Sequence, residues 1–272
     1  MKIPVALRLP LGLIVAISSL FLASKWQGNS AEIDTNARSG PMPEGMGSEL
    51  PQDPVDRIGF YNSLFTETKP SDRVAQILTS DPNTWAKDSL EYALAWAKET
   101  ENSALSALLL ADLATHFGDS SQHTEVARNL VFSAAENIDN PIAAAFLFQQ
   151  GKMWIDRGLE RNPNDMALRN ALIIYQSEYL NAPMQFLGTL RETLAIDSSN
   201  VETHFIHLNL LKKSQQWQKA LDKCQKLVSL QPQNPFWLYQ TSDLFGFLGD
   251  STNAKIYLDL AVKAQRTQNK TN

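Results

Sequence analysis

The sequence predicts an all-α chain of consecutive helical hairpins, and three observations carry this prediction. Apolar residues recur at helical spacing in long segments from Trp85 onward. Asn, Asp, Ser, Pro and Gly residues mark the ends of these segments. In the last third of the chain, matching residues recur at one fixed spacing: Val201 and Pro235, Ala220 and Ala254, Leu227 and Ala261. Nowhere does period-two alternation of useful length predict a strand.

Residues 1–26 predict an export segment. An uncharged run from Leu9 to Ser24 lies between Arg8 and Lys25. As a helix it would be about 24 Å long, shorter than a hydrocarbon core of about 30 Å. Basic side chains at its two ends can snorkel and close this gap.

We predict that this segment is retained, because both candidate cleavage sites lack a small residue at position −3. Residues 1–26 would then be a signal anchor that contacts the inner membrane through residues 3–26. The positive N-terminus would stay inside, and the bulk of the chain would be periplasmic. The alternative is a cleaved signal peptide and a soluble periplasmic protein.

Residues 27–54 predict a flexible linker, since this stretch is rich in Gly, Pro, Ser and acidic residues. Short helices are expected in 56–65 and 73–78, where Pro70 and Ser71 separate two apolar patterns.

Longer helices are then expected over residues 85–98, 104–117, 125–138 and 142–161. Their ends are marked by Asp81-Pro82, Asn102-Ser103, Gly118-Asp119 and Asn140-Pro141. Residues 55–163 are therefore predicted to form N-terminal hairpins, and short loops favour antiparallel neighbours.

The fixed spacing, about 34 residues, resembles that of the tetratricopeptide (TPR) repeat, whose unit is one helix-turn-helix. Residues 164–267 are predicted to contain three units, 167–200, 201–234 and 235–266, followed by a disordered tail at 268–272. The resemblance implies a TPR-type solenoid wound as a right-handed superhelix, with weaker TPR-like hairpins before it. A small residue such as Ala254 lets the second helix of a unit approach the first. Phe186 holds this position in the first unit, so its helices are expected to stand further apart or to use Gly188.

A narrower resemblance rests on RNPND at 161–165 and NAPMQFLGTLRETLAIDSSN at 181–200. These segments are similar to a family of membrane-anchored TPR proteins of Bacteroidetes-type bacteria. Phe186 replaces the Gly of that family's NPMQG motif. The resemblance implies protein–protein interaction at the inner membrane and no enzymatic activity.

TPR proteins bind partners in a concave groove lined by the first helix of each unit. Carried over by register, the resemblance implies groove candidates of mixed aromatic and charged character, which suit an extended or helical peptide. These candidates are Tyr175, Glu178, Tyr179, Phe205, Asn209, Lys212, Lys213, Phe236, Tyr239, Asp243 and Phe247.

Charge and chemistry-bearing residues narrow the function further. The net charge of −5 argues against a nucleic-acid partner, although basic side chains outnumber acidic ones from Lys212 onward. Cys224 is the only cysteine and is expected to be buried. Nucleophile, phosphate-binding and HExxH motifs are missing, so neither catalysis nor a cofactor or metal site is predicted.

The sequence therefore predicts a non-enzymatic scaffold or adaptor that binds a partner protein or peptide. A second hypothesis is an accessory factor in cytochrome c maturation or in metal or haem handling. Only the general architecture and the pair His204 and His207, one helical turn apart, favour it. Homo-oligomerisation through the terminal hairpin is a third alternative.

Overall fold

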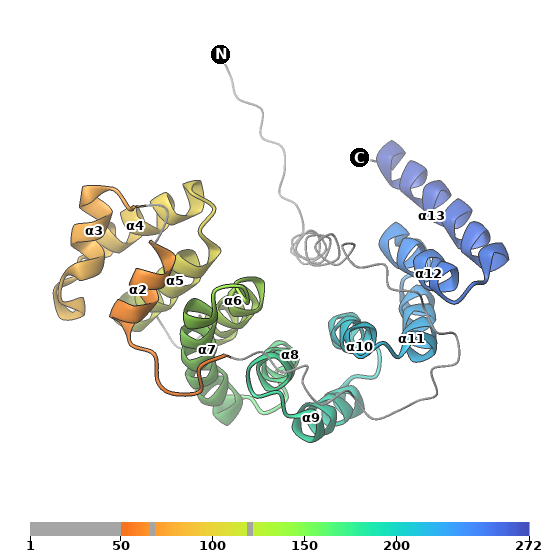
Figure 1. Ribbon diagram of the computed structural model, residues 1–272, viewed down its shortest axis with the longest axis horizontal. Helices are drawn as coiled ribbons and strands as arrows, with labels where there is room; N and C mark the ends of the chain where they lie inside the picture. The colour runs from red at the N-terminus through yellow and green to blue at the C-terminus, as the bar shows by residue number, and fades with distance from the viewer. Residues whose placement is uncertain (1–49, 66–68, 119–121, 272) are drawn as a thin grey trace, which may run out of the picture. The chain divides into compact units, whose positions relative to one another are not determined.

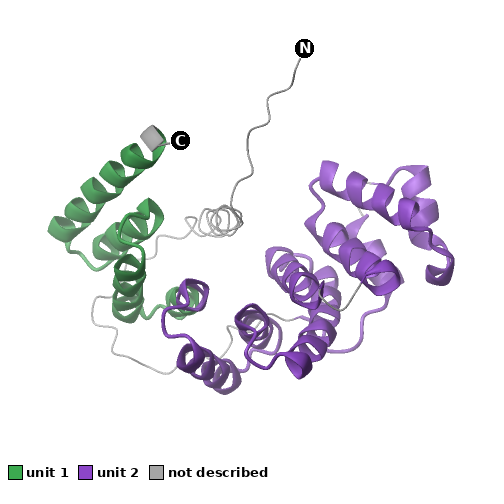
Figure 2. Ribbon diagram, turned by 180° about the vertical axis from the view of Figure 1, so that it is seen from behind, with its two compact units in different colours: residues 1–43, 207–272 green, residues 44–206 purple. Residues whose placement is uncertain are grey.

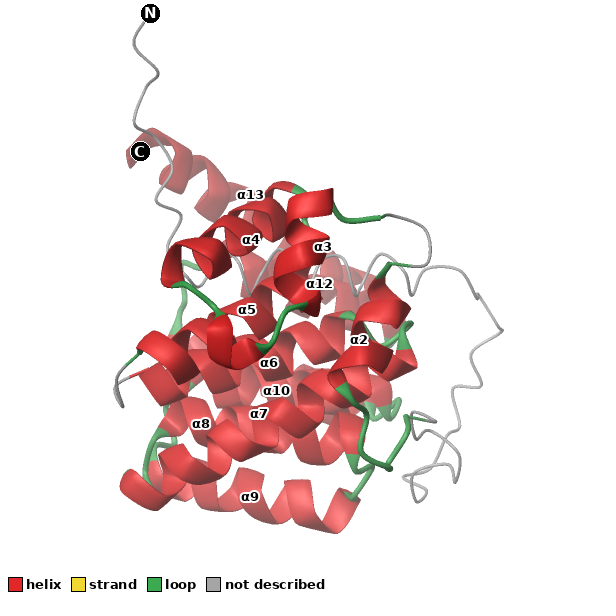
Figure 3. Ribbon diagram, turned by 90° about the vertical axis from the view of Figure 1, so that its left-hand side faces the viewer, coloured by secondary structure: helices red, strands yellow, loops and turns green. Residues whose placement is uncertain are grey.

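The computed structural model describes residues 50–271, apart from 66–68 and 119–121, and within these ranges the only regular elements are helices (Figure 3). This agrees with the predicted all-α class. The predicted signal anchor and most of the predicted linker lie outside the described residues. None of the described helices combines the length and the apolar character needed to cross a membrane.

The chain divides into two compact units, and the boundary falls between Ile206 and His207, inside one helix (Figure 2). The described part of the N-terminal unit is residues 50–206, and that of the C-terminal unit is residues 207–271. Each unit has its own set of packed helices.

The N-terminal unit is a series of antiparallel helices that follow the predicted segments closely (Figure 1). The α4 helix packs against α5, α6 against α7, and α2 lies on α7. The elements are α2 (Arg57–Leu64), α3 (Asp72–Thr79), η2 (Pro82–Thr84), α4 (Lys87–Glu99), α5 (Ser103–Phe117), α6 (His123–Glu136), α7 (Pro141–Arg161), α8 (Met166–Ile174), η4 (Tyr175–Tyr179) and α9 (Pro183–Ile196).

Side-chain caps start these helices where the sequence predicts them. The Asn102 side chain accepts a hydrogen bond from the backbone N–H of Leu105 at 2.9 Å, and Asn140 accepts one from Ala143 at 3.1 Å. Each cap satisfies an N–H group that has no partner within its own helix. The ends predicted for the longer helices of this unit therefore lie close to those in the structure.

The C-terminal unit contains the second part of α10 (Val201–Lys213), followed by α11 (Trp217–Leu230), α12 (Pro235–Phe247) and α13 (Ser251–Thr271). Leu238, Ala261 and Ala264 form a small buried cluster between α12 and α13, with Tyr239 and Tyr257 packed against it. The hydroxyl of Ser242 donates to the carbonyl of Ala254 at 2.8 Å and links the two helices.

The backbone turns reproduce the repeat period independently of residue type. Asn181, Gln215 and Gly249 all have positive φ, at 47°, 57° and 81°, and they stand at the same place in three successive copies of the repeat. All three connect the first helix of a hairpin to the second. A left-handed residue there ends one helix and lets the chain reverse. The turns of the described hairpins from α8 to α13 therefore recur at the predicted spacing.

The first repeat contains one additional residue in its first helix. The distance in sequence from its capping residue Asp165 to Asn181 is one position longer than that from Asn200 to Gln215 or from Asn234 to Gly249. The structure accommodates this residue as a π-helical turn, η4, in which the N–H of Leu180 bonds the carbonyl of Tyr175. A π turn is the usual consequence of such an insertion.

Two sequence expectations, on the C-terminal tail and on Gly188, differ from the structure. Residues 268–271 belong to α13 and not to a disordered tail, because no Gly or Pro ends the helix before them. Phe186 is buried, with 4% of its surface exposed, so it packs at the position expected to hold a small residue. Gly188 has open space around it and does not restore the expected close approach, since an added Cβ would meet no atom within 4 Å.

The position expected to hold a small residue is buried to different extents in two of the repeats. Variants that introduce a larger side chain there should therefore differ in stability. Ala220 is completely buried, whereas Ala254 is only half-buried. We expect Ala220→Leu to lower the free energy of unfolding by about 1–3 kcal/mol and Ala254→Leu to lower it less. Urea denaturation followed by tryptophan fluorescence measures both, and an equal effect of the two variants would contradict the difference in packing.

A buried ion pair fixes α2 and α5 in the N-terminal unit. The guanidinium of Arg57 donates two hydrogen bonds to the Asp112 carboxylate, at 2.7 and 2.8 Å, and the Asp112 side chain is only 8% exposed. Burial alone would lower the pKa of Arg57, but the hydrogen bonds and charge of Asp112 raise it above its ordinary value. Arg57 also lies 5.3 Å from the centre of the Trp85 ring.

Candidate functional site

The groove candidates are divided between the two units. Tyr175, Glu178, Tyr179 and Phe205 belong to the N-terminal unit, and the other seven belong to the C-terminal unit. The two sets therefore define two separate candidate surfaces, one in each unit.

Tyr175 and Tyr179 are buried, with 8% and 4% of their surfaces exposed. The Tyr179 ring stacks on Phe148 of α7, with ring centres 5.6 Å apart, and Tyr175 contacts the same ring edge-on at 6.2 Å. Burial raises the pKa of Tyr175, and neighbouring Tyr179 and Asp156 raise it further. Neither ring is therefore the open groove surface that the register implies.

A segment predicted to be linker covers Tyr179. Residues 50–55, here called the strap, have no regular secondary structure and bend at Asp53, and they bond residues of α7 and η4. The Tyr179 hydroxyl donates to the carbonyl of Pro51 at 2.8 Å, and the side chain of Gln52 donates to the carbonyl of Tyr179 at 3.1 Å. The predicted linker boundary is therefore wrong for residues 50–54, since polar partners and the burial of Leu50 hold them in place.

Gln149 of α7 completes the contact with the strap. Its Nε2 donates to the carbonyl of Asp53 at 2.9 Å, and its Oε1 accepts from the backbone N–H of Val55 at 3.0 Å. Nε2 also lies 2.8 Å from the Tyr179 hydroxyl, to which it donates. Gln149 could not be predicted from the sequence, because its strap partners lie far away in the chain and leave no local pattern.

The remaining candidates of the N-terminal unit differ in exposure. Phe205 is 8% exposed and packs in the interior, so it does not provide groove surface. Glu178, in the π turn, is half-buried.

In the C-terminal unit, the structure brings candidates of α10 and α12 together. The ammonium group of Lys212 donates to the side chain of Gln240 at 2.8 Å. Burial lowers the pKa of Lys212, while the charge of Asp243 opposes this shift. Burial likewise raises the pKa of Asp243, and Lys212 opposes that shift. Gln240 joins these candidates as a residue that the register did not select.

Aromatic and polar side chains extend this surface along α12. The rings of Phe247 and Trp217 are parallel and 5.2 Å apart, and 54% of Phe247 remains exposed. The Tyr239 hydroxyl lies 2.9 Å from the side-chain oxygen of Gln265, to which it donates, and Phe236 contacts Trp237 edge-on. Asn209 and Lys213 are exposed on α10. The α10–α12 surface is defined here by side chains of these two helices: Asn209, Lys212, Lys213, Phe236, Tyr239, Gln240, Asp243 and Phe247.

Cys224 is buried within the same unit, as the sequence predicts. Its Sγ lies 3.2 Å from the hydroxyl of Thr241 and 3.6 Å from the carbonyl of Trp237. Burial raises the pKa of the thiol to about 11. The side chain is therefore a packing residue and not a reactive nucleophile.

Iodoacetamide is expected to alkylate Cys224 roughly 100-fold more slowly in the folded protein at pH 8 than in guanidinium chloride, because reaction requires opening of the unit. The pKa of the thiol is 9.0 in the unfolded chain and about 11 in the folded unit. The free energy of unfolding should therefore fall as the pH rises through this interval. Mass spectrometry gives the alkylation rate. Equal rates in the two conditions would show that Cys224 is accessible.

The histidine pair does not assemble a metal site in the structure. Nε2 of His204 lies 2.9 Å from the carbonyl of Ser198, and since a carbonyl only accepts, this nitrogen donates. Within residues 50–271, excluding the two gaps, no group of three His, Cys, Asp or Glu side chains is placed to hold a metal ion.

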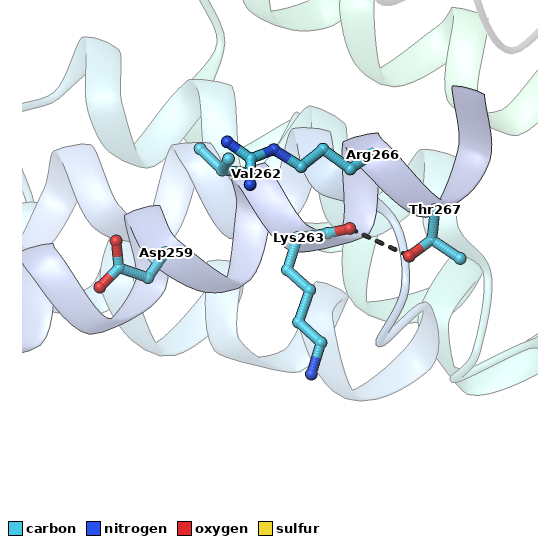
Figure 4. Close-up of a pocket in the computed structure, with 5 residues that line it drawn as sticks. All are labelled: Asp259, Val262, Lys263, Arg266 and Thr267. Carbon is cyan, nitrogen blue, oxygen red and sulfur yellow. Dashed lines mark hydrogen bonds between the residues drawn. The ribbon is translucent and has the colours of Figure 1, made fainter. Parts of the chain in front are cut away.

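The helices of residues 50–271 carry shallow hollows on their surface. One lies against α4, α5 and α6, where Leu110, Leu113 and Phe117 form an apolar part beside the Lys87 and Glu91 side chains. Another is bounded by residues of α13 alone (Figure 4): Asp259, Val262, Lys263, Arg266 and Thr267. Its Thr267 hydroxyl bonds the Lys263 carbonyl of the same helix, so this hollow is a helix surface and not an enclosed cavity.

The described residues thus form a protein of helical hairpins that repeat at the TPR period over α8 to α13. No protein-family model and no curated protein matches the sequence. The more specific resemblance to the membrane-anchored family of Bacteroidetes-type bacteria is not confirmed.

Several solved structures resemble the chain at low identity. MamA from Desulfovibrio magneticus RS-1, residues 41 to the end, is 14% identical over 70% of this chain and 98% of its own, with a TM-score of 0.44. MamA MSR-1 is 11% identical over 67% of this chain and 98% of its own, with a TM-score of 0.41. MamA AMB-1 is 12% identical over 66% of this chain and 92% of its own, with a TM-score of 0.38. Similarity at this level carries no conclusion about what the present chain binds.

Proposed function

We propose that the protein is a non-enzymatic scaffold that binds a partner protein through the α10–α12 surface. One observation carries the proposal: side chains from two successive repeats meet there, where Lys212 of α10 bonds Gln240 of α12 beside Asp243. Lys212 contributes an ammonium group, Gln240 an amide and Asp243 a carboxylate. The exposed Phe247 ring lies on the same helix as Asp243. Polar groups that fix orientation next to an aromatic anchor suit recognition of a peptide.

The aromatic anchor is the residue to test. Phe247 stacks on Trp217 yet leaves 54% of its surface exposed, so a partner side chain can cover it. Buried aromatic contacts at the centre of an interface typically account for about 2 kcal/mol or more of binding free energy. The rest of the surface then contributes specificity through charge and hydrogen bonds.

The test is affinity capture from membranes after chemical crosslinking, with the full chain as bait. Phe247→Ala and Lys212→Ala are expected to reduce recovery of the same specific partner by at least about tenfold. Leu258→Ala on α13 is the matched control, since Leu258 is also an exposed apolar residue, at 44%. Recovery that is unchanged by Phe247→Ala and Lys212→Ala would sink the proposal.

We further propose that the scaffold is anchored in the inner membrane and faces the periplasm. The apolar run from Leu9 to Ser24 and the basic residues that flank it support this proposal. Membranes washed with carbonate should retain the intact chain, and protease added to spheroplasts should degrade its helical part. Release of a shortened chain into the periplasmic fraction would instead establish cleavage of the segment.

A further inference from the structure

The strap is held on the N-terminal unit mainly through its main chain. Its Pro51 and Asp53 carbonyls and its Val55 N–H all bond side chains of the unit, at 2.8 to 3.0 Å. The single amide group of Gln149 contributes one donor and one acceptor to this set. An amide used in this way recognises the main chain of a segment and places few demands on the side chains of that segment.

Two strap side chains also take part: the Gln52 amide donates to the carbonyl of Tyr179 at 3.1 Å, and Leu50 is buried. Leu50 is 6% exposed, whereas Gln52, Asp53 and Pro54 are exposed to solvent. The strap therefore combines one buried apolar side chain with a main chain that bonds the site. Prolines such as Pro51 and Pro54 favour extended backbone and reduce the entropy lost on binding.

The floor of this site is held in place by residues that do not belong to the strap. Tyr179 packs on the fully buried Phe148, and Gln149 bonds its hydroxyl at 2.8 Å. The π turn that carries Tyr179 is closed by its own bonds from Leu180 and Ala182. Such π turns are frequent at functional sites. The donors and acceptors are thus oriented before a segment binds, which reduces the cost of binding.

We propose that Phe148, Gln149 and Tyr179 form a second binding site for a partner segment that offers main-chain donors and acceptors like those of the strap and an apolar residue in the place of Leu50, and that the strap fills this site as an internal competitor. This inference rests on the proposed scaffold function and adds a regulated second contact for the partner. A partner segment binds here only after it displaces the strap.

Chain connectivity favours a partner segment over the strap of a second copy. The strap leads through Asp56 directly into α2, and α2 packs on α7 of the same unit. A released strap therefore stays near the site, at an effective concentration in the millimolar range for such a short connection. A partner segment without α2 needs to displace only residues 50–55, whereas a copy of this chain would bring its own α2 to the same place.

The test uses the full chain and a fluorescent peptide of residues 48–56, Ser-Glu-Leu-Pro-Gln-Asp-Pro-Val-Asp, as the probe. Fluorescence anisotropy is measured with the unaltered chain and with Leu50→Asp, which removes the buried leucine of the strap. We expect the peptide to bind the Leu50→Asp chain at least about tenfold more tightly, because the internal competitor is weakened.

Two double variants, each with a second substitution added to Leu50→Asp, show whether the peptide binds at this site. Gln149→Ala in the Leu50→Asp chain should reduce affinity for the peptide at least about tenfold. Gln150→Ala in the same chain is the matched control, since Gln150 is the next residue of α7 and is half-buried like Gln149. Leu50→Ala is a milder strap variant for use if circular dichroism shows that Leu50→Asp does not fold.

The outcomes separate this inference from the scaffold proposal. Equal peptide affinity for the unaltered and strap variants, or affinity insensitive to Gln149→Ala, overturns the second site even if Phe247→Ala still abolishes partner capture. Peptide binding as expected, with partner capture insensitive to Phe247→Ala, overturns the α10–α12 proposal alone. Dimerisation of the Leu50→Asp chain in light scattering would make a second copy the occupant and contradict the partner assignment.

Discussion

Arg57→Met is expected to lower the free energy of unfolding of the N-terminal unit by about 3–5 kcal/mol. The substitution leaves the Asp112 carboxylate, 8% exposed, without the guanidinium that donates both of its short hydrogen bonds. Water cannot replace these bonds readily at a buried position, and an unpaired buried charge is costly. Loss of the contact between Arg57 and the Trp85 ring adds to the effect.

The control for Arg57→Met is Lys152→Met, which breaks an ion pair of similar length, 2.7 Å, at an exposed site. There the side chains are 35% and 53% exposed, so an effect of about 0–1 kcal/mol is expected. The double variant Arg57→Met, Asp112→Leu should recover much of the lost stability, because it removes the unpaired charge. Urea denaturation measures all three, and equal destabilisation by the two single variants would show that burial of the pair does not matter.

The helix order was predictable because the sequence marks helix ends with residues that have one local role. Asn102 and Asn140 cap helices through bonds to residues in the first turn that follows them. Such short-range preferences operate before any tertiary contact forms. The repeat period was predictable because equivalent positions of successive hairpins, such as Ala220 and Ala254, carry similar residues one period apart.

The π turn was not predictable from local preference. No Gly or Pro separates Tyr175 from Tyr179, and Ser177 between them bonds the carbonyl of Ile174 within the helix. The additional residue is visible only when Asp165 and Asn181 are compared with the later repeats. The positions of the first repeat were assigned by counting back one repeat period from the repeat that begins at Val201. Before the π turn, each position assigned in this way is therefore displaced by one residue.

The candidate site was predicted only in part because exposure is a property of tertiary contacts. Lys212, Asp243 and Phe247 form surface, as the register implies, while Tyr179 is covered by residues 50–55. The composition of residues 27–54 predicts a linker, and its C-terminal end bonds instead to Gln149 and Tyr179. Contacts between residues so far apart in the chain leave no periodic signal in the sequence.

Phe148→Ala is expected to destabilise the N-terminal unit by about 3–5 kcal/mol and to weaken the second site at the same time. Phe148 is completely buried, and its ring supports both Tyr175 and Tyr179. For a unit of this size, the midpoint of thermal unfolding should fall by roughly 6–20 °C. Differential scanning calorimetry measures this change.

The comparison of Phe148→Ala with Phe148→Leu separates the loss of volume from the loss of the aromatic contact. Leucine fills much of the cavity, so Phe148→Leu should cost less stability than Phe148→Ala. It still removes the ring on which Tyr179 stacks, and the Tyr179 hydroxyl then loses its fixed position beside the Pro51 carbonyl. In the Leu50→Asp chain, Phe148→Leu should therefore weaken binding of the residue 48–56 peptide although the unit remains folded. If Phe148→Ala and Phe148→Leu weaken peptide binding only in proportion to their loss of stability, the ring of Phe148 does not orient Tyr179.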